Sequence, residues 1–240
     1  MSPQARVVDT LPCQLAFDSE LDTDICQDCS MPNVVRPFKG VSAEDRVTQR
    51  RADLIDAALD LVGSGGIGNL TMTAVCEGAG LTQRYFYEHF RNRDELVVAL
   101  FDTVFDEFFG RVQDAVEAAP PDLSARAHAT MEVFVDFFAS DPRKARVFAE
   151  ATTADVVTAH KTESVHRFAE YAVGQVISTA GPFTEREQTR VLLAVIIIVG
   201  GQADAAAQWL RGTIDLPRDE FIDELAELFV TAVDAARKVR

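Results

Sequence analysis

Apolar residues recur every three or four positions along most of the chain after residue 42, which is the period of a helix with one buried face. Ser42 is followed three residues later by Asp45, which has the form of a capping box and predicts a helix start. Residues 63–66 are Gly-Ser-Gly-Gly and predict the end of that helix, because glycine favours the conformation of a helix C-terminus. No useful stretch alternates with period two, so the pattern predicts an all-α protein.

Two short helical segments, 72–79 and 83–90, follow the first helix. Thr71 and Thr82 are their expected N-caps, and Gly80-Leu81 forms a tight turn between them. Asn92, with Glu95 three residues later, begins a long helix that runs to residue 116. Proline and glycine then separate later helices, which are expected at 123–139, 142–151, 155–180, 184–211 and 218–238.

The pattern divides the chain into three parts. Residues 1–40 have no sustained period and contain prolines among scattered acids, as is typical of a disordered tail. Residues 41–95 are expected to form an N-terminal three-helix helix-turn-helix domain, and residues 96–240 a C-terminal helical regulatory domain.

The net charge of −15 is unevenly distributed along the chain. Residues 34–95 have nine acids and eight bases, so this segment is the least repelled by a phosphate backbone. Arg46, Arg50 and Arg51 lie beside the helix-turn-helix and are candidate phosphate contacts. For Arg36 and Lys39, a phosphate contact and a simple solvated charge are equally good interpretations.

The second short helix has the side chains of a DNA-reading helix. Its apolar positions are needed for contact with the helix before it, which leaves hydrogen-bonding and stacking groups on the exposed face. Such a helix can enter the major groove with its first residues facing base edges. The candidates on this face are Gln83, Arg84, Tyr85, Tyr87 and His89.

The segment from Ala79 to Phe90, Ala-Gly-Leu-Thr-Gln-Arg-Tyr-Phe-Tyr-Glu-His-Phe, resembles the TetR family of transcriptional regulators. That family has a small-residue turn followed by a Tyr-x-His-Phe ending, and the similarity covers about residues 42–105. The family pattern differs here at Tyr85, which is bulkier than usual, and at Glu88, an acid close to DNA.

The resemblance implies a role for each matching residue. Arg84 would suit the O6 and N7 atoms of guanine and Gln83 would suit adenine, with Tyr85 also facing bases. Thr73 lies where the first helix of the motif approaches the DNA backbone. The implied phosphate contacts, together with the cap of the reading helix, are Thr71, Thr82, Tyr87, His89 and Arg93.

Twelve of the sixteen phenylalanines lie after residue 96. Such a set can fill a core or line an apolar cavity, and for a single residue the core is the commoner role. The resemblance implies a ligand pocket between the middle helices. The candidate ligand-binding residues are Phe105, Phe109, Phe134, Phe138, Phe168, Tyr171, Glu150 and His166.

The segment 184–211 is apolar on more than one face, and the helix after it has an apolar stripe. Two such helices at the end of the chain suit a symmetric four-helix dimer interface, which is also where the family places its dimer contact. Burial within one subunit is the alternative. The expected interface residues are Val195, Ile198, Val199, Gly201, Ala205, Trp209, Phe221, Leu225 and Leu228.

Other kinds of protein find less support. The sequence shows no signal peptide, the apolar stretch 191–201 is too short for a bilayer and predicts a buried helix, and a cytoplasmic protein is expected. No nucleophile with a base, phosphate loop or carboxylate pair predicts an enzyme, and neither a cofactor nor a metal is expected. Cys13, Cys26 and Cys29 leave a metal or thiol sensor open.

The leading hypothesis is a homodimeric repressor that leaves a near-palindromic double-stranded operator when a small, largely apolar effector binds. A ligand-independent regulator or architectural DNA-binding protein would have the same helix-turn-helix domain but no usable cavity. The sequence does not name the ligand, the operator or the target genes.

Overall fold

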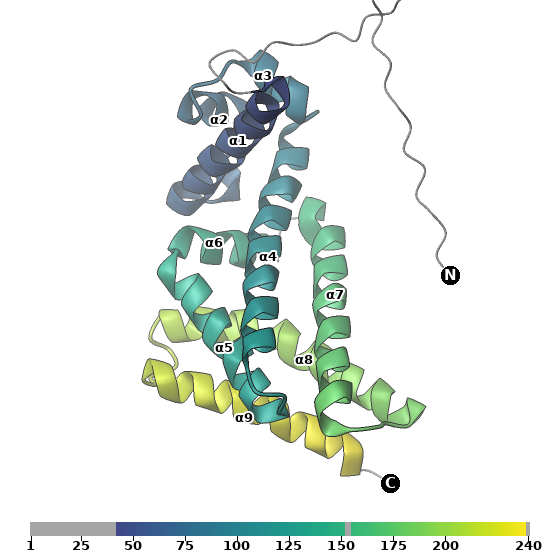
Figure 1. Cartoon of the computed structure of the whole chain (residues 1–240). Coiled ribbons are helices and arrows are strands. Elements are labelled where there is room, and N and C mark those ends of the chain that lie inside the picture. Colours follow the sequence, from purple (N-terminus) through teal and green to yellow (C-terminus); the bar gives the residue numbers. More distant parts are fainter. Residues whose placement is uncertain (1–41, 152–154, 239–240) are drawn as a thin grey trace, which may run out of the picture.

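The computed structural model describes residues 42–151 and 155–238, and every regular element in these ranges is helical (Figure 1). The predictions for residues 1–40, including those for the three N-terminal cysteines, lie outside the described residues. The elements are α1 (Ala43–Gly65), η1 (Ile67–Asn69), α2 (Met72–Gly78), α3 (Gln83–His89), α4 (Arg93–Ala118), α5 (Leu123–Ser140), α6 (Pro142–Ala151), α7 (Asp155–Ala180), α8 (Glu185–Leu210) and α9 (Arg218–Lys238).

Most helix starts follow the predicted caps. Ser42 and Asp45 form a reciprocal capping box, with the Asp45 amide donating to Ser42 Oγ at 2.9 Å. The amide of Glu95 donates to Asn92 Oδ1 at 2.9 Å and begins α4. Thr82 is the exception, because it takes the N-cap position of α3 without a side-chain cap hydrogen bond. Its exposed hydroxyl therefore stays available to a partner.

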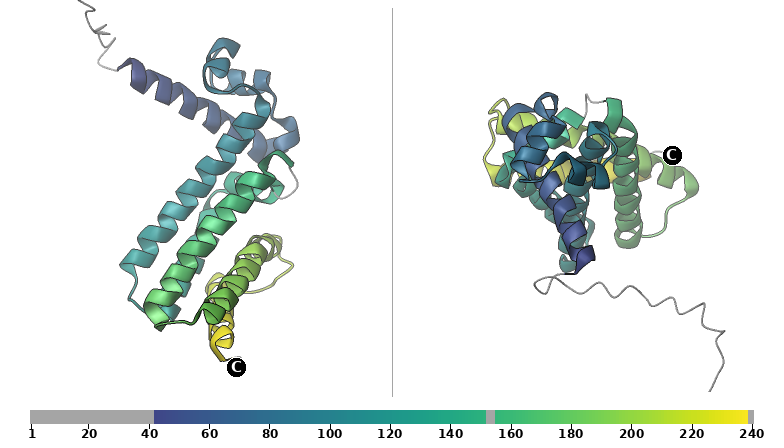
Figure 2. Two further views of the ribbon diagram at one scale, coloured as in Figure 1. Left: turned by 90° about the vertical axis from the view of Figure 1, so that its right-hand side faces the viewer. Right: turned by 90° about the horizontal axis from the view of Figure 1, so that it is seen from above.

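The molecule consists of a small head and a longer helical body (Figure 2). The head contains α1, α2 and α3, and α4 runs from the head through the whole length of the body. The second long helix, α7, lies beside α4, while α8 and α9 lie at the end of the body away from the head (Figure 2). The short helix α6 packs against α1 and so joins the body to the head.

Phenylalanine side chains form the centre of the body. The ring of Phe108 in α4 is 5.6 Å from that of Phe137 in α5 and 5.8 Å from that of Phe168 in α7. All three side chains are buried. Aromatic pairs at these separations add to the stabilisation from apolar burial, so α4, α5 and α7 form one packed unit.

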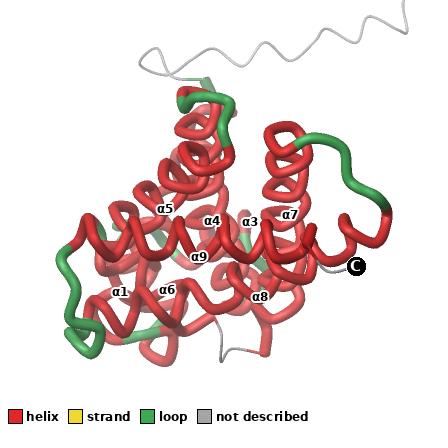
Figure 3. Tube along the Cα trace, turned by 90° about the horizontal axis from the view of Figure 1, so that it is seen from below, coloured by secondary structure: helices red, strands yellow, loops and turns green. Residues whose placement is uncertain are grey.

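Helices α8 and α9 pack along one another at the end of the body, as the view from below shows (Figure 3). Trp209 near the end of α8 stacks on Phe221 of α9, with ring centroids 5.1 Å apart and planes within 2° of parallel. Its indole N–H donates to the Leu216 carbonyl at 2.9 Å, which closes the turn between the two helices.

Candidate DNA-binding surface, effector cavity and subunit interface

The turn of the helix-turn-helix has the predicted form. Gly80 takes a φ of +64°, a conformation that side chains with a Cβ rarely adopt. The Leu81 amide donates to the Cys76 carbonyl at 2.9 Å, so the chain reverses tightly between α2 and α3. Val75 and Phe86 are fully buried beneath the turn and fix the two helices against each other.

The reading face of α3 is exposed. The Arg84 side chain is 85% exposed, Tyr87 is 58% exposed, and Gln83 is exposed beside them. Tyr85 is half-buried, and the guanidinium of Arg50 in α1 lies over its ring at 4.7 Å. The structure therefore brings Gln83, Arg84 and Tyr87 together on the surface and turns Tyr85 toward α1.

Glu88 lies between two arginines on this face. Its carboxylate is 3.3 Å from Arg84 Nε and 3.8 Å from the Arg50 guanidinium. These partly exposed pairs are individually weak, so DNA phosphates and base edges can compete for both arginines. The acid that departs from the family pattern thus pairs with the groups expected to face DNA.

The predicted phosphate contacts do not all have free side chains. Thr73 is exposed and Arg46 is half-buried, while the hydroxyl of Thr71 accepts from the Ala74 amide at 3.2 Å as the cap of α2. The Nε2 atom of His89 is buried and has no partner among the described residues. Burial and the nearby Arg50 charge lower the pKa of His89, so its ring is neutral at pH 7.

Arg93 has partners inside the protein. Its Nε donates to the Leu70 carbonyl at 2.6 Å, and its NH2 donates to the Ile67 carbonyl. The start of α4 is thereby tied to the segment between α1 and α2. This arrangement indicates that Arg93 holds the head together, a role that the sequence did not suggest.

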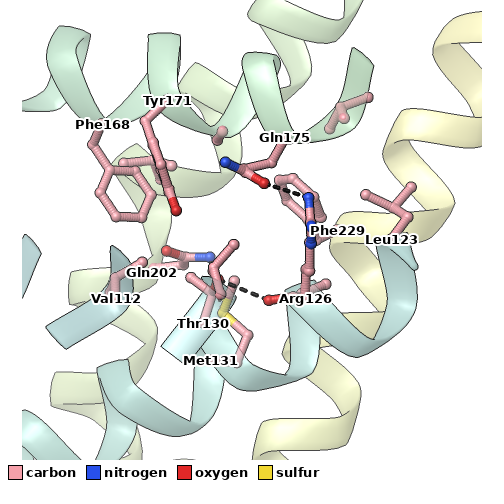
Figure 4. Close-up of a pocket in the computed structure, with 15 residues that line it drawn as sticks. Val112, Leu123, Arg126, Thr130, Met131, Phe168, Tyr171, Gln175, Gln202 and Phe229 are labelled. Carbon is pink, nitrogen blue, oxygen red and sulfur yellow. Dashed lines mark hydrogen bonds between the residues drawn. The ribbon is translucent and has the colours of Figure 1, made fainter. Parts of the chain in front are cut away.

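Two adjoining cavities lie inside the body. The larger has a volume of about 280 Å³, and its walls include the predicted Phe105, Phe134, Phe138 and Phe168. The smaller has a volume of about 40 Å³ and is bordered by Phe168 and Tyr171 (Figure 4). Phe109 borders neither cavity but packs against both Phe168 and Tyr171.

The two predicted charged anchors are not in these cavities. Glu150 lies at the contact between α6 and the head, and His166 is exposed and 3.2 Å from Glu170 on the outer face of α7. Neither residue borders either cavity, so the structure offers no support for these two predicted ligand contacts. The polar cavity residues that the sequence missed are Arg126, Thr130, Gln175 and Gln202 around the smaller cavity, and Lys161, Ser164, Asp204 and Arg211 around the larger.

The contact between α6 and the head is polar. Glu150 Oε2 accepts from the Ile67 amide at 2.6 Å, and Arg143 of the same helix lies 2.5 Å from Asp60 of α1. Burial disfavours the charged form of Glu150, but hydrogen bonds from Arg146 and Ile67 outweigh it and lower the pKa of that carboxyl. A shift of α6 would therefore pull directly on the end of α1 and the segment after it.

The apolar surface of α8 differs in detail from the prediction. Val195, Phe221 and Leu225 are buried within the chain and therefore cannot meet a second copy. Trp209 is engaged with α9, and Val199 borders both cavities. Of the other predicted residues, Leu228 and Gly201 are exposed, and Ile198 and Ala205 are half-buried.

The exposed large apolar residues of α8 are instead Leu193, Ile196 and Ile197, at 58%, 41% and 65% exposure, and Leu210 at its end, at 47%. By length and composition this helix could also cross a membrane, and 24% of its most apolar window is buried in the chain. Within the single chain, the helix that was expected to be buried is therefore only partly buried. An apolar face of this size needs a covering partner.

The head and body together define a helix-turn-helix transcription factor whose α-helical body contains cavities. A family model described as bacterial regulatory proteins, tetR family, matches residues 54–100. The helix-turn-helix head is that of the TetR family, and the chain is a DNA-binding transcriptional regulator.

Comparisons with individual proteins agree with this assignment. The chain is 24% identical over 191 residues to the HTH-type transcriptional activator FasR of Mycolicibacterium smegmatis, covering 78% of this chain and 85% of FasR. A TetR-like regulator from Rhodococcus sp. RHA1 has the same fold, with a TM-score of 0.61, 19% identity and coverage of 77% and 96% of the two chains. The regulator FadR from Bacillus subtilis, solved with stearoyl-CoA, has a TM-score of 0.61 at 13% identity, with coverage of 75% and 98%.

Proposed function

We propose that the protein binds a near-palindromic DNA site as a homodimer, in the cytoplasm, with α3 of each subunit in a major groove. The observation that supports this most directly is the exposed group of Gln83, Arg84 and Tyr87 on a short helix held rigidly by a buried turn. Arg84 reads guanine, and Gln83 reads adenine. Thr73, Thr82 and Arg46 surround this face and hold the flanking phosphates.

A second copy of the chain covers the apolar face of α8. In a two-fold interface the same surface meets itself, so a residue on one side of the axis meets a residue on the other side. Arg190 lies seven residues before Ile197 and Asp204 lies seven after it, which is two helical turns in each direction. If the two-fold axis passes near Ile197, two antiparallel α8 helices place Arg190 of each subunit opposite Asp204 of the other. The apolar residues then lie between these two pairs of opposite charges.

The body responds to a small effector. A regulator that ignored ligands would need no cavity, whereas this body contains a phenylalanine-lined space of about 280 Å³. The bound stearoyl-CoA in FadR from Bacillus subtilis supports the view that this fold accommodates a ligand with a long apolar chain. The effector acts by favouring a state in which α6 has shifted and the two heads no longer match the operator. Release of the operator then ends repression.

Arg84→Ala tests the reading helix, with the DNA site first selected from a random pool by the parent protein. The substitution should weaken binding to this site by about 1–3 kcal/mol and relax the preference at one base pair, because it removes a bidentate contact. Fluorescence anisotropy titrations at fixed salt measure both effects.

Arg111→Ala is the matched control, because Arg111 forms the same kind of i,i+4 pair, with Glu107, at 2.6 Å on the body. It should bind the selected site as the parent does. Parent-like affinity of Arg84→Ala for that site would show that α3 does not read bases through this arginine.

A further inference from the structure

The two cavities adjoin one another and differ in the chemistry of their walls. They share Phe168, Val199 and Gln202 as common walls. Phenylalanine rings form much of the wall of the larger cavity, which suits an apolar chain or ring system, and Lys161, Asp204 and Arg211 also border it. The smaller cavity has a volume of about 40 Å³, which is room for a small polar group but not for a second chain.

Polar groups from three helices surround the smaller cavity (Figure 4). Arg126 comes from α5, Tyr171 and Gln175 from α7, and Gln202 from α8, and the tips of Tyr171 and Gln202 point toward each other across the space. The Gln202 side chain is buried and donates to Met131 Sδ at 3.2 Å, and sulfur is a weak acceptor. These groups can provide more hydrogen bonds than they make with one another.

Arg126 brings a positive charge to this space without a matching acid. Its NH1 donates to Gln175 Oε1 at 2.6 Å and to Ser178 Oγ at 3.3 Å, which are both neutral acceptors. Its Nε is buried without a partner, and no carboxylate in the described parts of the chain forms an ion pair with it. A half-buried guanidinium with an orphaned N–H favours an anion beside it.

We propose that the effector is an amphipathic carboxylate: its apolar part fills the larger cavity and its single anionic head lies in the smaller one, paired with Arg126. The two oxygens of a carboxylate match the forked donors of a guanidinium. The Gln202 amide and the Tyr171 hydroxyl provide further donors, and burial raises the pKa of Tyr171, which keeps that hydroxyl protonated. This inference rests on the proposed effector-responsive function and specifies the chemistry of the effector.

The test uses three probes that share one chain, namely dodecanoate, 1-dodecanol and dodecyltrimethylammonium. Calorimetric titration of the full-length parent at pH 8, below the micelle concentration of each probe, measures the three affinities. Dodecanoate should bind about tenfold or more tightly than dodecanol, because a charge-assisted pair replaces a neutral contact. The cation should bind most weakly.

Arg126→Gln should remove the preference for dodecanoate and leave dodecanol binding unchanged, and Arg126→Lys should keep part of it. Arg111→Gln is the control, because Arg111 is an arginine of α4 that borders neither of the two cavities, and it should behave as the parent. Thermal unfolding of each variant shows that it is folded.

Equal affinity of the folded parent for dodecanoate and dodecanol would overturn the inference, and so would a preference for dodecanoate that survives in Arg126→Gln. Failure of all three probes to bind would overturn it as well. Operator binding is titrated in parallel. Tight, Arg126-dependent binding of dodecanoate that leaves operator affinity unchanged would support the head-group assignment and contradict the effector-responsive function instead.

Discussion

Ile197→Glu should convert the protein from a dimer into a monomer. Ile197 is 65% exposed in the single chain, which makes it the most exposed of the large apolar residues of α8. If a second copy covers the apolar face of α8, the new carboxylate must leave water without a partner, which costs several kcal/mol. Two-fold symmetry imposes that cost on both subunits and also places the two like charges near each other.

Sedimentation velocity over a range of protein concentrations measures the effect. Val47→Glu is the matched control, because it puts the same acid at an apolar position that is 45% exposed on α1, far from α8. The control should sediment as the parent does. Operator affinity of Ile197→Glu should fall together with dimerisation, since a monomer makes only half of the contacts. A stable dimer of Ile197→Glu with parent-like operator affinity would place the subunit interface on another surface.

Arg93→Ala should lower the free energy of unfolding of the head by about 1.5–3 kcal/mol, the range for hydrogen bonds from a charged group. Arg93 donates to the carbonyls of Ile67 and Leu70, and the side chain of Leu70 is fully buried. The substitution removes the side-chain donor from both carbonyls, leaving only the Leu70 amide on that of Ile67, and frees the start of α4 from the segment before α2.

Urea unfolding followed by circular dichroism measures this loss. Arg91→Ala is the control, because Arg91 is 88% exposed and pairs only with the nearby Glu95 among the described residues. Its stability should stay within about 0.5 kcal/mol of the parent. Unchanged stability of Arg93→Ala, combined with a weaker salt dependence of DNA binding, would instead support the phosphate contact that the family resemblance implied.

The helices could be predicted from the sequence because their signals are local. Ser42, Asn92 and the glycines of residues 63–66 act on the backbone within a few positions, so the predicted and observed ends of the helices agree closely. The exposed face of α3 could be predicted too, because apolar positions recur every three or four residues on its buried side. The exception at Thr82 is also local, because its hydroxyl does not make the hydrogen bond that its position allows.

The cavity and the interface depend on packing between helices that lie far apart in the sequence. Arg126, Tyr171 and Gln202 meet only because α5, α7 and α8 converge, and no spacing within one helix indicates this. The apolar residues of α8 surround the helix, so periodicity could not separate the buried Val195 from the exposed Ile197. For the same reason, the sequence could not show that Glu150 contacts the segment after α1.

The stacking of Trp209 on Phe221 gives the protein its own optical reporter. The chain has a single tryptophan, so its fluorescence spectrum originates from one site between α8 and α9. Ala206, Ala207 and Leu210 flank that tryptophan on α8 and border the larger cavity. Occupation of the cavity should therefore change the emission of Trp209, and effector binding can be followed in the unlabelled protein with a spectrofluorimeter alone.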